Sequence, residues 1–207
     1  MTRHALLAAL LLTVAAAAAS GKELDNPAET TWRQVTWDDF KGGDSTAGRW
    51  DTGAWAHLAS GIDLDAFESG TRVDDDGSWL ATPIAIEAYA VMDKFLSGVA
   101  RGARKDEVLA HEQLHFDVTE ALARRLTARL LGMVGRGDDA DAAMRDLQGQ
   151  VQRAYDETIG ELRAYQQRYD SDTRHGGDRK KQKRWSQQIG ELFAEATAEL
   201  AKARSSS

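Results

Sequence analysis

The pattern of apolar and polar residues changes near residue 105 from one typical of strands to one typical of helices. Before that point the clearest alternation is Ile84–Met92, in which every second residue is apolar and belongs to one face. Ala54–Leu64 alternates more loosely, and the VDDDG sequence of Val73–Gly77 is typical of a hairpin turn. Residues 44–92 are therefore expected to be β-structure, with Pro83 tolerated at the start of a strand.

Three helices are predicted after that point. The first begins near Lys105, with Asp106 or a neighbour as its cap, and ends at the glycines of Gly132–Gly137. The second starts from caps in Asp138–Asp141, and the third runs from roughly Lys181 to Ala203. Strands followed by helices, with no repeat and no dividing linker, predict an α+β fold: a mostly antiparallel N-terminal β-sheet followed by three α-helices.

The first twenty residues are typical of a signal peptide. Arg3 precedes an apolar run of about 15 residues, and Ala-Ala-Ala-Ser-Gly follows it as a cleavage site. The run is shorter than the roughly 20 residues that span a bilayer, so a cleaved signal is favoured over a membrane anchor. We expect residues 1–20 to be removed and residues 21–207 to form one domain, with its core at about 32–203, in the periplasm or the medium.

Composition narrows the chemistry of any site. The chain has no cysteine, so a metal ion would be held by histidines and carboxylates rather than by thiolates. The net charge of −7 argues against nucleic-acid binding, and no second stretch is apolar enough to cross a membrane. A basic run from Arg174 to Arg184 could touch anionic lipid or cell-wall polymer, but such runs are more often solvated surface, which we prefer.

The segment His111-Glu112-Gln113-Leu114-His115 carries the candidate chemistry, because it is an HExxH sequence inside a predicted helix. Residues four apart lie on one helix face, so His111 and His115 can bind one metal ion from the same side. Glu112 then lies where a carboxylate can take a proton from water held by the metal. A chance pair of histidines is the alternative, and the helical context argues against it.

A catalytic zinc site needs a third protein ligand. Asp117 and Glu120 lie about 200° and about 140° round the helix from His115, so neither reaches the same ion from a straight helix. His175 is the preferred ligand, because it lies at a helix end beside Gly176. The alternatives are first His57 on a strand, and then two carboxylates of the second helix, Glu157 and Glu161.

Several residues near these candidate ligands could support them. A ligating imidazole usually donates its other N–H to a carboxylate or carbonyl, and we consider Asp117, Glu120 and Asp170 for that role, with surface acids as the alternative. Tyr169, six residues before His175, is the candidate hydroxyl donor to an oxyanion. Its alternative role is that of a core aromatic residue closing the second helix.

These segments resemble a known bacterial family. The HEQLHFDVTE sequence from His111, the YDSDTRHG sequence from Tyr169, Gln182–Trp185 with Ile189, and the TWDDFKG sequence from Thr36 are similar to domain of unknown function 922, described as predicted secreted zinc-dependent proteases. The resemblance covers roughly residues 32–192. It implies a zincin-like fold and supports pairing His175 with the HExxH helix, whereas Lys94–Arg104 does not align with it.

The sequence therefore predicts a secreted zinc metallopeptidase that acts on a protein or peptide. Zn²⁺ is held by His111, His115 and His175, Glu112 is the general base and Tyr169 assists. Substrate is expected to pair along the Ile84–Met92 strand. The alternatives are an exported non-catalytic binding protein with a structural or vestigial metal site, and a zinc hydrolase of a cell-envelope amide; the presence of Glu112 argues against the first.

Overall fold

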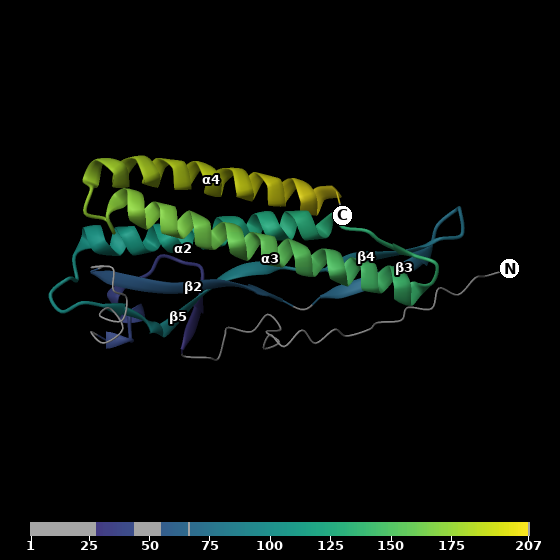
Figure 1. Cartoon of the computed structure of the whole chain (residues 1–207), viewed down its shortest axis with the longest axis horizontal. Coiled ribbons are helices and arrows are strands. Elements are labelled where there is room, and N and C mark those ends of the chain that lie inside the picture. The colour runs from purple at the N-terminus through teal and green to yellow at the C-terminus, as the bar shows by residue number, and fades with distance from the viewer. Residues whose placement is uncertain (1–27, 44–54, 66, 207) are drawn as a thin grey trace.

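Antiparallel strands dominate the first half of the chain. The structure is a computed structural model that describes residues 28–43, 55–65 and 67–206, so the predicted signal peptide lies outside the described residues (Figure 1). One sheet has the order β1-β5-β2, formed by Glu29–Thr31, Ala88–Val99 and Ala56–Leu64. A second has the order β3-β4-β6, formed by Glu68–Val73, Trp79–Ala85 and Gly135–Gly137.

Three long helices follow the strands and cover one side of the sheets. They are α2 (Asp106–Leu131), α3 (Ala140–Thr173) and α4 (Arg179–Ser206), and a short 3₁₀ helix, η1, spans Trp37–Asp39. In Figure 1 the helices lie side by side, with α3 running opposite to α2 and α4. The predicted α+β fold, strands first and then three helices, is therefore confirmed. Among the described residues, no helix is both long enough and apolar enough to cross a bilayer.

Caps and charges explain where the helices begin. The Asp139 carboxylate accepts a hydrogen bond from the Ala142 backbone N–H at 2.6 Å, and Asp178 does the same for Lys181 at 3.1 Å ahead of α4. For α2 the N-cap is Lys105, which makes no side-chain capping bond. Asp106 lies instead in the first turn, where a negative charge interacts favourably with the helix dipole.

The predicted VDDDG turn joins β3 to β4. The Asp74 N–H donates to the Ser78 carbonyl at 2.8 Å, and the Gly77 N–H donates to the Asp74 carbonyl at 3.0 Å. Gly77 has a φ of +89°, which glycine adopts without the steric cost that a Cβ would add.

The predicted strand Ile84–Met92 is divided between two sheets. Ile84 belongs to the end of β4 and is 57% exposed, whereas Ala88 begins β5. The predicted alternation holds from Ile86 onward, since Ile86, Ala88, Ala90 and Met92 are all buried. β5 then continues to Val99, through part of the Gly- and Arg-rich stretch that did not align with the family.

The glycine-rich segment that follows α2 forms a strand, which was not predicted from the sequence. β6 pairs with β4, opposing Gly135 to Ala81 and Gly137 to Trp79. A Cβ on Gly135 would lie only 2.2 Å from the Ala143 carbonyl oxygen and 2.6 Å from the Leu147 nitrogen. The short glycine-bearing strand therefore lets the first turns of α3 lie directly against it.

α2 is the central helix of the core. Its inward residues include Leu122, Leu126 and Leu130, each at most 1% exposed, and these belong to one cluster with Leu162 of α3 and Ile189 of α4. A second cluster joins Phe116 of α2 to the β1-β5-β2 sheet and to the segment around η1. The N-terminal turns of α2 are thereby enclosed between the sheet and the two other helices.

We expect Gly135→Ala to lower the free energy of unfolding by about 1–3 kcal/mol or more, because the new methyl group would overlap the backbone of α3. Urea unfolding followed by circular dichroism measures this. Gly160→Ala is the matched control: a Cβ at this position of α3 meets nothing within 4 Å, so the change should raise stability by about 0.5–1 kcal/mol. Equal unfolding midpoints for the wild type and Gly135→Ala would contradict the packing described.

Candidate metal centre

His111 and His115 point from α2 into the interior, one turn apart. Their Nε2 atoms lie 3.3 Å from each other, and the two rings meet edge to face with centroids 4.9 Å apart. The residues are only 2% and 7% exposed. Two buried imidazoles that present nitrogens to the same point are the arrangement expected of a shared ligand site.

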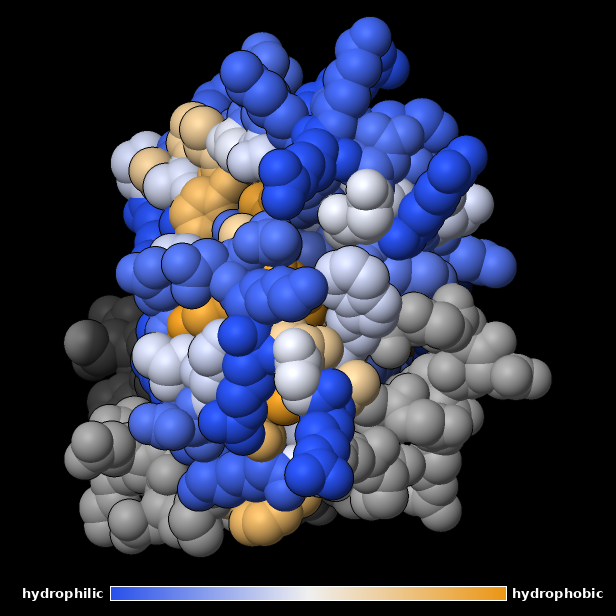
Figure 2. Space-filling model, turned by 90° about the vertical axis from the view of Figure 1, so that its left-hand side faces the viewer, coloured by the Kyte–Doolittle hydropathy of each residue, from blue (hydrophilic) through white to orange (hydrophobic). Residues whose placement is uncertain are grey.

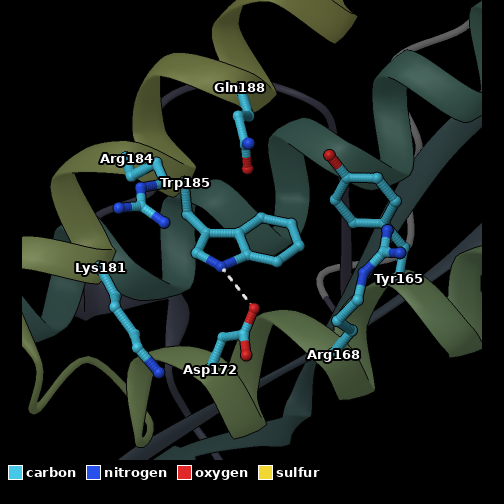
Figure 3. Close-up of a pocket in the computed structure, with 7 residues that line it drawn as sticks. All are labelled: Tyr165, Arg168, Asp172, Lys181, Arg184, Trp185 and Gln188. Atoms are coloured by element: carbon cyan, nitrogen blue, oxygen red, sulfur yellow. Dashed lines mark hydrogen bonds between the residues drawn. The ribbon is translucent and has the colours of Figure 1, made fainter.

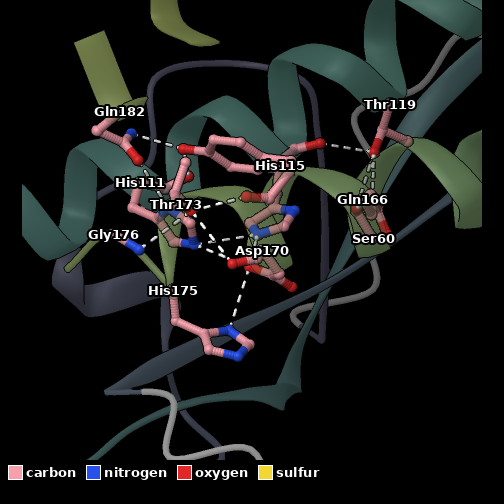
Figure 4. Close-up of polar contacts among 11 residues, drawn as sticks. Ser60, His111, His115, Thr119, Gln166, Asp170, Thr173, His175, Gly176 and Gln182 are labelled. Atoms are coloured by element: carbon pink, nitrogen blue, oxygen red, sulfur yellow. Dashed lines mark hydrogen bonds and ion pairs between the residues drawn. The ribbon is translucent and has the colours of Figure 1, made fainter. Parts of the chain in front are cut away.

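A carboxylate from α3 completes this group. Asp170 Oδ1 lies 3.0 Å from His111 Nε2 and 3.0 Å from His115 Nε2 (Figure 4). The ligand atoms of the three residues all lie within 4.8 Å of one another, so the group can hold a metal ion. We call His111, His115 and Asp170 the metal cluster.

The electrostatics of the metal cluster favour a charged carboxylate. Burial raises the pKa of Asp170, but hydrogen bonds and positive charge from His111 and His115 outweigh it and hold that pKa far below its usual value. Burial also lowers the pKa of His115, whereas Asp170 and then Glu112 raise it by more. Asp170 is thus kept ionised, as a metal-ligating carboxylate must be.

Glu112 lies in the same buried environment. The residue is 3% exposed, and burial raises the pKa of its carboxyl against the opposing effect of the His115 and His111 charges. The backbone of Leu58, in β2, hydrogen-bonds this carboxylate. Burial therefore raises the pKa of Glu112, and the carboxyl group is held between α2 and the sheet.

The first residues of α4 hold the other side of the His111 ring. Gln182 Oε1 lies 3.1 Å from His111 Nδ1, and Gln182 Nε2 donates to the Tyr169 hydroxyl at 2.6 Å. In the tautomer in which Nδ1 donates to this amide oxygen, Nε2 is the nitrogen available to a bound metal ion. Gln182 was not predicted to have a role, although its spacing of three and seven from the apolar Trp185 and Ile189 indicates an inward-facing position.

Tyr169, the predicted oxyanion donor, is fully buried beneath the two histidines. Its ring stacks on His111 with centroids 4.6 Å apart and meets His115 edge to face at 4.8 Å. Its hydroxyl donates to the His111 carbonyl at 3.3 Å and accepts from Gln182. In this arrangement the hydroxyl is already engaged, so Tyr169 orients the histidines rather than facing a substrate.

His175, the predicted third ligand, lies beside the metal cluster rather than within it. Its Nδ1 is 3.3 Å from Asp170 Oδ1, and its side chain is 28% exposed. The α3–α4 turn holds it there, with left-handed backbone at Arg174 (φ 54°), His175 (φ 51°) and Gly176 (φ 80°). A Cβ on Gly176 would lie 3.2 Å from the His111 ring, so only glycine lets this turn approach so closely. The metal-ligand role of His175 stays a prediction.

His57, the next candidate, lies in β2, near enough to the metal cluster for the charges of His115 and Asp170 to affect its pKa. Burial first, and then the positive charge of His115, lower its pKa to about 4, while the Asp170 charge acts in the opposite direction. Such long-range effects require that the three side chains share one region. His57 is therefore a neutral imidazole beside the metal cluster at neutral pH.

The remaining candidate acids have other roles. Asp117 accepts hydrogen bonds from Trp32 Nε1 at 2.9 Å and Gln113 Nε2 at 2.8 Å, and Glu120 accepts from the Ala90 N–H at 3.2 Å. Glu157 pairs with Arg129, and Glu161 is exposed. Of the acids considered from the sequence, Asp170 alone contacts the histidines, and it does so directly.

Replacing Asp170 tests the metal cluster. We expect Asp170→Ala to weaken binding of a divalent transition metal at least tenfold, which corresponds to about 1.4 kcal/mol, because one of three ligand atoms is lost. Competition with a chromophoric chelator measures the affinity. Glu161→Ala removes an exposed carboxylate from the same helix and should leave the affinity unchanged. Equal affinities for both variants would exclude Asp170 as a ligand.

Comparison with known proteins identifies a family but no activity. A family model described as "Bacterial protein of unknown function (DUF922)" matches residues 103–176, a segment that contains the metal cluster, Glu112 and His175. No curated protein and no solved structure matches the chain. The likeness to zincins therefore stays a prediction from the HExxH sequence. The match supports the family resemblance that was predicted from the sequence, over residues 103–176.

Proposed function

We propose that this protein is an exported zinc-dependent peptidase in which Glu112 is the general base. The observation that carries the proposal is the position of Glu112, a buried carboxylate with a raised pKa beside the metal cluster. A purely structural metal site needs ligands but no adjacent base. Export is proposed from the signal-peptide pattern of residues 1–20.

The donor set of the metal cluster supports zinc. Two imidazole nitrogens and one carboxylate oxygen match the three protein ligands of catalytic zinc sites, and the chain has no thiolate to offer. When bound, zinc polarises a carbonyl group and lowers the pKa of water. Gln182 and Tyr169 support the set from behind by fixing the tautomer and the plane of His111.

Proton transfer is assigned to Glu112. Its raised pKa lets the carboxylate hold a proton taken from attacking water and then pass that proton to the leaving amine. The contact with the Leu58 backbone keeps the carboxylate at the side of the metal cluster that faces β2. Because the Tyr169 hydroxyl is engaged elsewhere, we assign the oxyanion donor to the neutral imidazole of His57, whose N–H can donate a hydrogen bond.

The substrate strand is assigned to β2 rather than to Ile84–Met92. β5 is paired with β2 from Ala88 onward and with β1 at Val91–Asp93, and the N–H groups of Ala88 and Ala90 donate to side chains of α2, so little of the predicted strand is open to a substrate. β2 is an edge strand of its sheet among the described residues, and it carries both His57 and Leu58. An extended peptide paired along β2 would pass next to Glu112.

Glu112→Gln should retain zinc and lose most peptide hydrolysis. The amide keeps the size of the side chain but cannot take up a proton, which typically costs a factor of about 10²–10⁴ in rate. The full chain is expressed, the exported protein is purified, and zinc content and cleavage of a quenched-peptide library are measured. Glu107→Gln, an exposed position on the same helix, is the matched control. A Glu112→Gln protein as active as the wild type would refute the mechanism.

A second candidate function is an exported binding protein with a structural zinc. The observation in its favour is His175 Nδ1, 3.3 Å from the same Asp170 oxygen that both other histidines contact. If His175 joined the metal cluster, four protein ligands would surround the ion, which is typical of structural sites without an open position.

His175→Ala distinguishes the two functions. A peptidase that uses the metal cluster should keep its metal affinity within about threefold and retain the visible absorption spectrum of the Co²⁺-substituted protein, because the ligands are unchanged. A loss of more than about tenfold, together with a changed Co²⁺ spectrum, would instead assign His175 as a ligand and favour the closed structural site.

A further inference from the structure

A groove that is separate from the metal cluster runs between α3 and α4. It has a volume of about 580 Å³ (Figure 3). α3 lines it with Tyr165, Arg168 and Asp172, which lie three and four residues apart and so on one face. α4 contributes Lys181, Arg184, Trp185 and Gln188, at the same helical spacing. We call this feature the α3–α4 groove.

Its three cations are not held in salt bridges among the described residues, although the charge of Lys181 helps to lower the pKa of Asp178. Arg168, Lys181 and Arg184 are exposed, and none makes an ion pair with an acid in the part of the chain that the structure describes. The single carboxylate of the groove, Asp172, accepts a hydrogen bond from Trp185 Nε1 at 3.2 Å. The groove therefore has excess positive charge.

The chain as a whole is acidic, unlike this groove. The protein has 33 acidic and 26 basic residues, and arginines nearby are paired with acids. Arg124 pairs with Glu120, Arg125 with Glu195 and Glu199, and Arg129 with Glu157. Acidic side chains are thus plentiful on these helices, but Asp172 is the single acid in the lining of the groove.

Aromatic rings hold one of these cations in place. The Arg168 guanidinium lies 5.2 Å from the centroid of Tyr165 and 5.6 Å from that of Trp185. The two rings contact each other edge to face at 5.4 Å, and Trp185 is only 6% exposed. A guanidinium fixed by cation–π contacts loses little further freedom when it binds an anion.

The composition of the groove indicates the class of its ligand. Tyr, Trp and Arg are the residues that contribute most of the binding energy at protein–protein interfaces. The excess positive charge of the groove favours a ligand of opposite charge. We propose that the α3–α4 groove binds an acidic segment of a polypeptide, whose carboxylates pair with Arg168, Lys181 and Arg184.

The bound segment would lie close to the metal cluster without touching it. Trp185 packs on Tyr169 with centroids 5.5 Å apart, and Tyr169 in turn stacks on His111. Figure 2 views this end of the molecule, where a mostly hydrophilic surface is broken by small apolar patches. Binding in the α3–α4 groove requires neither a metal ion nor Glu112, so the proposal stands apart from the proposed peptidase function.

The test uses a fluorescein-labelled peptide of alternating Asp and Glu with a central Phe, and measures binding to the full-length exported protein by fluorescence anisotropy. We expect saturable binding that weakens as salt is added. Arg168→Glu combined with Arg184→Glu should weaken it at least about tenfold. The matched control, Arg145→Glu combined with Arg163→Glu, makes the same charge change at exposed positions of α3 and should bind like the wild type.

A second pair of variants and a chelator control distinguish binding in the α3–α4 groove from binding elsewhere. Lys181→Gln with Arg184→Gln is the milder pair, used if the charge reversal lowers the melting temperature. A chelator should leave binding intact, and loss of binding with chelator would assign the peptide to the metal cluster instead. Absence of saturable binding, equal weakening by the control pair, or equally tight binding of polyphosphate or of phosphatidylglycerol vesicles would each overturn the proposal.

Discussion

The contact between Asp170 and the two histidines of α2 is the constraint on which the rest of the structure depends. One carboxylate oxygen of the partly buried Asp170 lies 3.0 Å from the Nε2 atoms of two buried histidines, whose polar atoms would be costly to leave unpaired. It fixes the end of α3 against the start of α2. The left-handed turn, the absence of a side chain at Gly176 and the reach of Gln182 from α4 all follow from bringing that end so close.

α2 combines this role with a structural one on its other faces. His111, Glu112 and His115 point inward, while Gln113 accepts a hydrogen bond from the Val35 N–H at 2.7 Å and Asp117 accepts one from Trp32. The residues between and beside the histidines thus attach the N-terminal segment to the helix. The HEQLHFD sequence therefore specifies both the histidines of the metal cluster and the packing around them. This explains why its other polar residues, Gln113 and Asp117, make hydrogen bonds within the protein.

The features that depend on periodicity and helix geometry could be predicted from the sequence. The features that depend on tertiary contacts could not. The helices, the VDDDG turn and the exclusion of Asp117 from the metal cluster follow from local spacing. β6 was not predicted, because two glycines indicate the end of a helix. Their strand conformation depends on the packing of α3 against them. Asp170 was considered as a supporting acid, not a ligand, because its distance from the histidines depends on how α3 crosses α2. Its signal was a polar residue that continues the inward face from Leu162 through Gln166.

The geometry of the α3–α4 turn places His175 at the edge of the metal cluster. Two consecutive non-glycine residues, Arg174 and His175, adopt left-handed backbone, at a cost of about 1–2 kcal/mol each. The structure offsets this cost through the bond from the His175 N–H to the Asp170 carbonyl at 3.0 Å and from the Gly176 N–H to Thr173 Oγ1 at 3.3 Å. The turn thus holds His175 Nδ1 3.3 Å from Asp170 Oδ1, the oxygen that both other histidines contact. The same hydrogen bonds therefore set the distance of His175 from the metal cluster, and that distance is what separates an open catalytic site from a closed structural site.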